Sequence, residues 1–169
     1  MMDVRAPSAV EGYVSDHLAG AAAAIQLAER CRTRDPASEL GHELQRLLGD
    51  IEEDKRVLER VLEAAGGSPQ PIKRVSALGM ELLANLRMSL PVLGPGSAEA
   101  ARLEEIETLC LGIEGKRLLW RALASADGGL AGFDFEDLER RAEAQRDRLE
   151  RFRLQLASTA FRVSSAEEA

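Results

Sequence analysis

The sequence predicts an all-α protein, and three observations support this fold class. Aromatic residues make up only 4% of the chain, whereas the helix-forming residues Ala, Leu, Glu and Arg are abundant. Apolar residues recur at steps of three and four, the period of an amphipathic helix. Breaks rich in Gly, Pro or Asp separate these stretches. With 169 residues, 45% of them hydrophobic, we expect one bundle domain over 9–161, an N-terminal arm over 1–8 and a disordered tail over 162–169.

The clearest element is a helix over about 36–65. Asp35 suits the N-cap, Pro36 suits the first helical position, and Gly66 and Gly67 follow the last turn. One polar residue, Asp54, falls within its apolar stripe. The stripe otherwise consists of Leu40, Leu44, Leu47, Ile51, Leu58, Val61 and Ala65.

The other stretches predict four further helices, over about 9–33, 72–90, 98–126 and 135–161. Ser8 and Glu11 form a capping box before the first, and Ser97 and Asp134 can cap the last two. A very short turn joins the first two long helices, so they should form an antiparallel hairpin. We therefore expect a four-helix bundle of two antiparallel hairpins joined by a helical crossover, 72–90.

Composition excludes several classes of protein. The net charge of −7 argues against a nucleic-acid-binding protein. No apolar run reaches membrane-spanning length, and the apolar stretch 18–25 follows acidic residues where a signal peptide would be basic. Cys31 and Cys110 both occupy apolar-face positions, which fits free thiols in a reducing compartment. We expect a cytoplasmic protein without nucleic-acid or membrane partners.

Several polar residues should meet at mid-bundle. His17 and Asp54 lie equally far from the first turn, so we expect an imidazole–carboxylate hydrogen bond between them. Gln145 lies mid-stripe in the last helix, opposite the step formed by Lys116 and Arg117. Buried charges need partners. The expected polar layer consists of His17, Asp54, Glu114 or Arg117, and Gln145.

Four long helices with a long crossover and polar side chains at mid-bundle resemble the ferritin-like superfamily. A ferritin-like di-iron site uses a Glu on each of two helices and Glu-x-x-His on the other two. Stretches 98–126 and 135–161 contain no His, so the resemblance implies the fold while the di-iron motifs are not intact. We expect no cofactor; if iron or manganese binds, the ligands this chain offers are His17, Asp54, Glu107 and Glu114.

Three functional hypotheses follow. The first, which we favour, is a metal-free ferritin-like homodimer with a structural or protein-interaction role. The second is a divergent iron or manganese storage or oxidase protein. The third is a partner-binding module that presents residues 72–93. The Leu and Met surplus of residues 78–93 is either the outer cover of the bundle or a dimer surface. No phosphate loop, Cys-x-x-Cys pair or Ser/His/Asp set points to a common enzyme class. The candidate interaction surface is Leu78, Met80, Leu83 and Met88.

Overall fold

The computed structural model describes residues 8–68, 98–126 and 130–162. These residues form four α-helices and no strand, which confirms the all-α, four-helix prediction. The helix expected over 72–90, most of the N-terminal arm, and the tail beyond residue 162 lie outside the described residues. The helices are α1 (Ala9–Arg32), α2 (Glu39–Ala64), α4 (Ala98–Ala124) and α5 (Phe135–Ala160).

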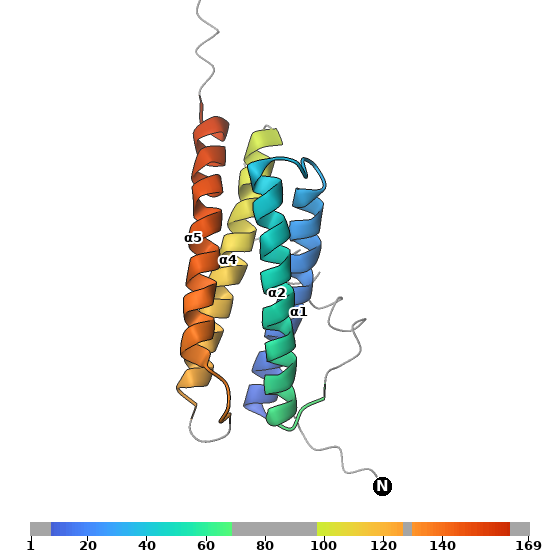
Figure 1. Ribbon diagram of the computed structural model, residues 1–169, viewed down its shortest axis with the longest axis vertical. Helices are drawn as coiled ribbons and strands as arrows, with labels where there is room; N and C mark the ends of the chain where they lie inside the picture. Colours follow the sequence, from blue (N-terminus) through green and yellow to red (C-terminus); the bar gives the residue numbers. More distant parts are fainter. Residues whose placement is uncertain (1–7, 69–97, 127–129, 163–169) are drawn as a thin grey trace, which may run out of the picture.

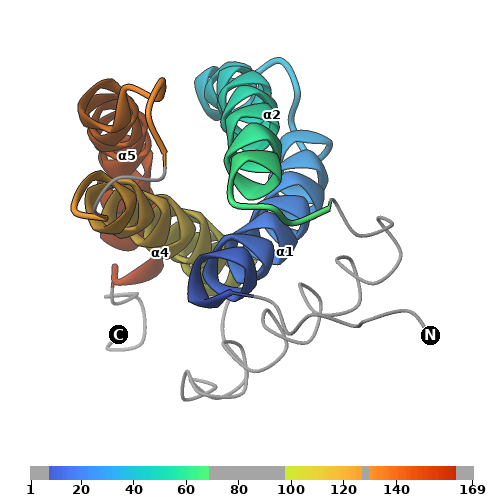
Figure 2. The same ribbon diagram turned by 90° about the horizontal axis from the view of Figure 1, so that it is seen from below.

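The helices pack lengthwise in two adjacent pairs. Figure 1 shows α1 beside α2 and α4 beside α5, with the members of each pair running in opposite directions. Viewed along the bundle, the order around it is α2, α1, α4, α5 (Figure 2), and α1 also contacts α4 while α2 contacts α5. Helices α2 and α4 run in the same direction, so α2 ends at the end of the bundle opposite to the start of α4 (Figure 1).

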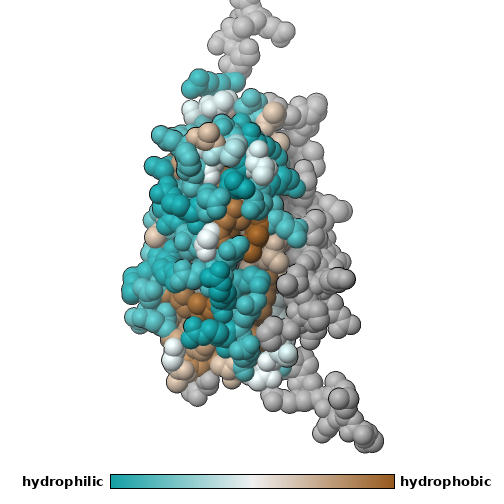
Figure 3. Space-filling view, turned by 45° about the vertical axis from the view of Figure 1, so that its right-hand side comes forward, coloured by the Kyte–Doolittle hydropathy of each residue, from teal (hydrophilic) through white to brown (hydrophobic). Residues whose placement is uncertain are grey.

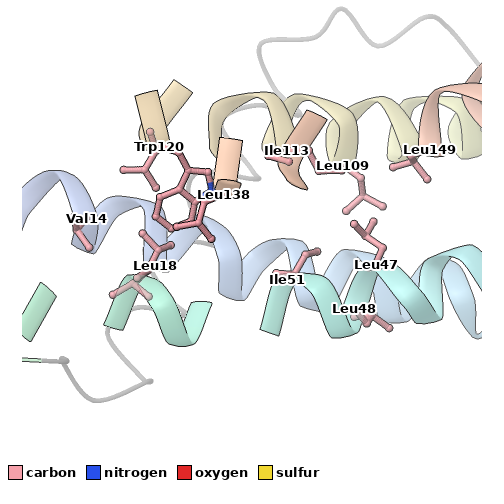
Figure 4. Packing of buried hydrophobic residues seen from close by; sticks show 14 of the residues in the cluster. Val14, Leu18, Leu47, Leu48, Ile51, Leu109, Ile113, Trp120, Leu138 and Leu149 are labelled. Atoms are coloured by element: carbon pink, nitrogen blue, oxygen red, sulfur yellow. The ribbon is translucent and has the colours of Figure 1, made fainter. Parts of the chain in front are cut away.

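The hydrophobic core is formed by apolar residues on the inner faces of all four helices (Figure 4). Residues at helical spacing from each helix are almost fully buried, which removes apolar surface from water. Trp120 is the largest of them, and its ring stacks on Phe135 at a centroid distance of 6.2 Å. The labelled core residues come from α1 (Val14, Leu18), α2 (Leu47, Leu48, Ile51), α4 (Leu109, Ile113, Trp120) and α5 (Leu138, Leu149).

Polar side chains cap the starts of α1, α2 and α5, whereas Ser97, the expected cap of α4, lies outside the described residues. Ser8 accepts a hydrogen bond from the Glu11 backbone N at 3.2 Å, and Asp134 accepts one from the Asp137 backbone N at 2.9 Å. The start of α2 differs from the expectation, because Ser38 and not Asp35 is its N-cap. The Ser38 hydroxyl accepts from the Gly41 backbone N at 3.0 Å and donates to the Asp35 backbone O at 2.7 Å. Residues 35–38 therefore form a turn before the helix rather than its first turn.

This turn folds back against the first turn of α2, and Gly41 allows the contact. A Cβ at Gly41 would lie 2.3 Å from the Asp35 backbone O and 2.9 Å from Pro36. The absence of a side chain lets the turn approach the helix backbone. At the other end of α2, Gly66 has φ of +85°, the left-handed conformation that glycine adopts readily after a helix.

The face of the bundle shown in Figure 3 is largely hydrophilic, with smaller hydrophobic areas between the charged side chains. Apolar side chains that stay substantially exposed are spread over α1, α4 and α5 and the residue after α5: Tyr13, Leu111, Leu118, Leu154 and Phe161. Within the described ranges, none of the helices combines the length and the apolar character needed to cross a membrane.

Candidate functional site

The polar centre of the bundle is a cluster of four side chains from three helices. Asp54 of α2 is only 1% exposed. Its Oδ2 accepts hydrogen bonds from Lys116 Nζ at 2.5 Å and from Gln145 Nε2 at 3.1 Å. Gln145 Oε1 accepts a further hydrogen bond from Lys116 Nζ. Arg141 Nη2 of α5 lies 3.3 Å from Asp54 Oδ1 as an ion pair without hydrogen-bond geometry. The carboxylate therefore faces two cations and an amide.

Lys116 reaches this centre because it continues the inner stripe of α4. It follows Leu109 and Ile113 and precedes Trp120 at steps of three and four residues. Its side chain is 12% exposed. Burial lowers the pKa of the Lys116 ammonium, and the Asp54 carboxylate opposes that effect by favouring the charged form. The ammonium thus depends on Asp54 to offset the cost of its burial.

His17 does not bind Asp54. Among the described residues its ring makes an edge-on contact with Tyr13, with centroids 4.8 Å apart. Burial lowers the pKa of His17, and the neighbouring Asp16 carboxylate raises it by less. The expected imidazole–carboxylate hydrogen bond is replaced by the bond from Lys116, whose long side chain reaches Asp54 from across the core.

Glu114 and Arg117 lie on the seam between α4 and α5 rather than in the central cluster. Arg117 Nη2 is 2.7 Å from Glu114 Oε1, and Arg117 Nη1 is 2.8 Å from Glu139 Oε1. The hydrogen bond from Arg117 lowers the pKa of Glu114, which also lies 3.4 Å from Arg146. Both residues are partly exposed. The polar layer expected from the sequence is therefore two separate groups of charges, one around Asp54 and one between α4 and α5.

The second buried carboxylate, Glu43, is one that the sequence analysis did not single out. It is 1% exposed and binds Arg148 Nε of α5 at 2.8 Å and Arg46 Nη2 at 2.6 Å. Arg148 Nη2 also binds Asp50 Oδ2 at 2.5 Å. A signal was present, because Glu43 stands three residues after Leu40 and four before Leu47, at the edge of the apolar stripe. These bonds link α2 to α5.

The two cysteines are half-buried free thiols. Burial raises the pKa of both Cys31 and Cys110 to about 11. A thiol with a raised pKa stays protonated near neutral pH and is a poor nucleophile. The raised pKa therefore gives neither cysteine the features of an activated nucleophile.

The candidate metal ligands do not converge. In residues 8–68, 98–126 and 130–162, no group of three or more His, Cys, Asp and Glu side chains is placed to hold a metal ion. Glu107 binds Arg153 Nη1 at 3.0 Å, and Glu114 and Asp54 have the cationic partners given above. His17 is the fourth candidate and makes its ring contact with Tyr13. Each of the three candidate carboxylates is instead ion-paired with an arginine or lysine side chain.

A cavity of about 360 Å³ lies between α1, α2 and α4, and we call it the α1–α4 cavity. His17, Asp54 and Lys116 contribute its polar lining, together with Asp16 and Lys55. Most of the remaining lining is apolar or small. The small residues are Gly20, Ala21, Ala23 and Ala24 of α1 and Gly112 and Gly115 of α4.

Comparison with known proteins assigns no family: the chain matches no protein-family model, no curated protein and no solved structure.

Proposed function

We propose that the chain is a non-enzymatic, ferritin-like helical bundle with a structural or protein-interaction role. One observation carries the proposal. At mid-bundle, where ferritin-like di-iron proteins hold their metals between helical carboxylates, the ammonium of Lys116 binds Asp54 and Gln145. The ammonium pairs with the most deeply buried carboxylate of the described mid-bundle cluster, and this supports a structural role for that carboxylate over metal binding.

The arrangement of helices supports the ferritin-like part of the proposal. Two adjacent antiparallel pairs, with α2 and α4 running in the same direction (Figure 1), agree with hairpins joined by a long connection. The interior charges support the non-enzymatic part. Glu43 and Asp54 are both held by arginine or lysine side chains, so neither carboxylate is available as a free general base.

Metal loading tests the proposal directly. The purified protein is incubated anaerobically with Fe(II) or Mn(II), desalted, and analysed for metal per chain, and oxygen uptake is followed after Fe(II) addition. We expect substoichiometric metal and no protein-dependent oxygen uptake. Asp54→Asn and Glu107→Gln are measured in parallel, with Glu52→Gln at an exposed position of α2 as the control.

The opposite result is equally clear. At least one metal ion per chain, lost in Asp54→Asn and Glu107→Gln but kept in Glu52→Gln, would establish the metal-binding alternative with His17, Asp54, Glu107 and Glu114 as candidate ligands. Such a result would require Lys116 to leave Asp54 when the metal binds.

The homodimer and the cytoplasmic location remain predictions. A homodimer would use exposed apolar side chains such as Leu118 on α4, which is 50% exposed and lies outside the α1–α4 cavity. Light scattering across a concentration series measures the mass directly, and a monomer at all concentrations would refute the dimer. The candidate interaction residues Leu78, Met80, Leu83 and Met88 lie outside the described residues.

A further inference from the structure

We propose that the α1–α4 cavity is the docking site for the chain's own residues 72–90. The contact is internal to the chain and holds whether or not the bundle binds another protein. It rests on the shape and lining of the cavity, on where the chain leaves and rejoins the bundle, and on the pattern of apolar residues in 72–90.

The cavity carries helical glycines for which the described residues give no packing reason. A Cβ built on Gly20, Gly112 or Gly115 would meet no heavy atom within 4 Å in the part of the chain that the structure describes. Glycine inside a helix is unfavourable relative to alanine. Three glycines that line one cavity from two helices are explained if another segment approaches their backbones closely.

The positions at which the described chain stops before residue 69 and resumes after residue 97 also favour the α1–α4 cavity. Helix α2 ends at one end of the bundle, and α4 begins at the other (Figure 1). Around the bundle α1 lies between α2 and α4 on one side, and α5 lies between them on the other (Figure 2). The α5 side is closed by ion pairs of Arg148 with Glu43 and Asp50 and of Arg141 with Glu53. The α1 side instead offers the apolar lining of the cavity.

The sequence of 72–90 suits this site. At helical spacing, most of its large apolar residues fall on one side, and its charged residues fall on the other together with Met80 and Met88. Large side chains opposite small ones allow two helices to pack closely. A helix of this length would extend about 27 Å at 1.5 Å per residue, most of the length of α4. The apolar side comprises Ile72, Val75, Leu78, Leu82, Leu86 and Leu90, and the opposite side carries Lys73, Arg74, Glu81 and Arg87.

Hydrogen exchange measured by mass spectrometry tests the proposal on the full chain, at a concentration where light scattering gives a monomer. We expect amides in 72–90 to exchange about 100-fold more slowly than in a free peptide of the same sequence, because docking protects them. Gly112→Leu fills the cavity and should return these amides to within a few-fold of the free-peptide rate. Gly49→Leu is the matched control, since Gly49 is a helical glycine with equal open space that lies outside the cavity.

Protection of α1, α2, α4 and α5 in each variant shows that the bundle still folds. Three results would overturn the proposal. The first is exchange of the wild-type amides in 72–90 at the free-peptide rate. The second is protection of these amides that Gly112→Leu leaves unchanged. The third is protection that disappears on dilution from dimer to monomer, which would make a second copy the occupant.

Discussion

At the scale of single residues, Asp54 and Lys116 determine the character of the core. Both lie on inner helix faces, and without Asp54 the Lys116 ammonium would be a buried charge with no ionic partner, whereas Asp54 without Lys116 would still face Arg141. Gln145 adds one donor and one acceptor to the same pair. A pair of this kind opposes sliding of α2, α4 and α5 along one another, because a shift of one turn would separate all three groups.

His17 gives a prediction of pH dependence. Burial lowers its folded-state pKa below the value of 6.5 that applies in the unfolded chain. Between these two values the unfolded state binds more protons, so the free energy of unfolding decreases as the pH falls below 6.5. When urea unfolding is measured at about pH 7 and about pH 5, the free energy of unfolding should decrease more between the two for the wild type than for His17→Gln.

The control for His17 is the same substitution at His42, which is exposed on α2. His42→Gln should keep the pH dependence of the wild type. An identical decrease in all three proteins would show that burial of His17 does not contribute.

At the scale of elements, the start of α2 yields a prediction about its cap. Ser38→Ala removes the acceptor for the Gly41 backbone N and the donor to the Asp35 backbone O. We expect a loss of about 1 kcal/mol in the free energy of unfolding. Asp35→Ala keeps both backbone groups and should cost less. A larger loss for Asp35→Ala in urea unfolding would place the cap at Asp35 after all.

Two glycines of α2 should respond to alanine with opposite signs. Gly41→Ala places a Cβ against the Asp35 and Pro36 backbone, so we expect destabilisation by about 1–3 kcal/mol. At Gly49 a Cβ meets nothing within 4 Å of the described residues, and Gly49→Ala should stabilise the helix by about 0.5–1 kcal/mol. Thermal unfolding of both variants checks the pair, and a stabilising Gly41→Ala would contradict the turn geometry.

The helices and their inner faces followed from local patterns, whereas the pairing of polar groups did not. Equal distance from the first turn placed His17 and Asp54 at a similar depth, but it did not determine the direction of each side chain around its helix. Asp54 is directed by partners on α4 and α5. Of the adjacent residues Lys116 and Arg117, only Lys116 lies on the inner face of α4. Its spacing of three residues from Ile113 and four from Trp120 indicates this position.

The start of α2 shows the same limit. Local sequence offers two good caps, Asp35 and Ser38, within one turn. The choice between them depends on the turn that packs over Gly41, which no local pattern contains.

At the scale of the whole molecule, ion pairs cross the seams between helices. Glu105 of α4 binds Arg30 and Arg34 at the end of α1, and Arg153 of α5 binds Glu107 of α4. Exposed pairs of this kind contribute roughly 0–1 kcal/mol each. The pairs with almost fully buried carboxylates, at Glu43 and Asp54, are the ones whose disruption should destabilise the bundle strongly.

The central claim is that Lys116 is the structural counter-ion of Asp54, and a double-mutant cycle in urea unfolding tests it most directly. Asp54→Leu leaves Lys116 buried and unpaired and should cost about 3–5 kcal/mol. Lys116→Met should cost less, because Arg141 and Gln145 still face Asp54. Glu52 and Arg56, an exposed pair 3.8 Å apart on α2, provide the control cycle, with an expected coupling below about 0.5 kcal/mol.

The double variant Asp54→Leu/Lys116→Met should be more stable than the two single losses predict, with a coupling energy of about 2 kcal/mol or more. Losses that add to within about 0.5 kcal/mol would contradict a direct ion pair at the centre of the bundle.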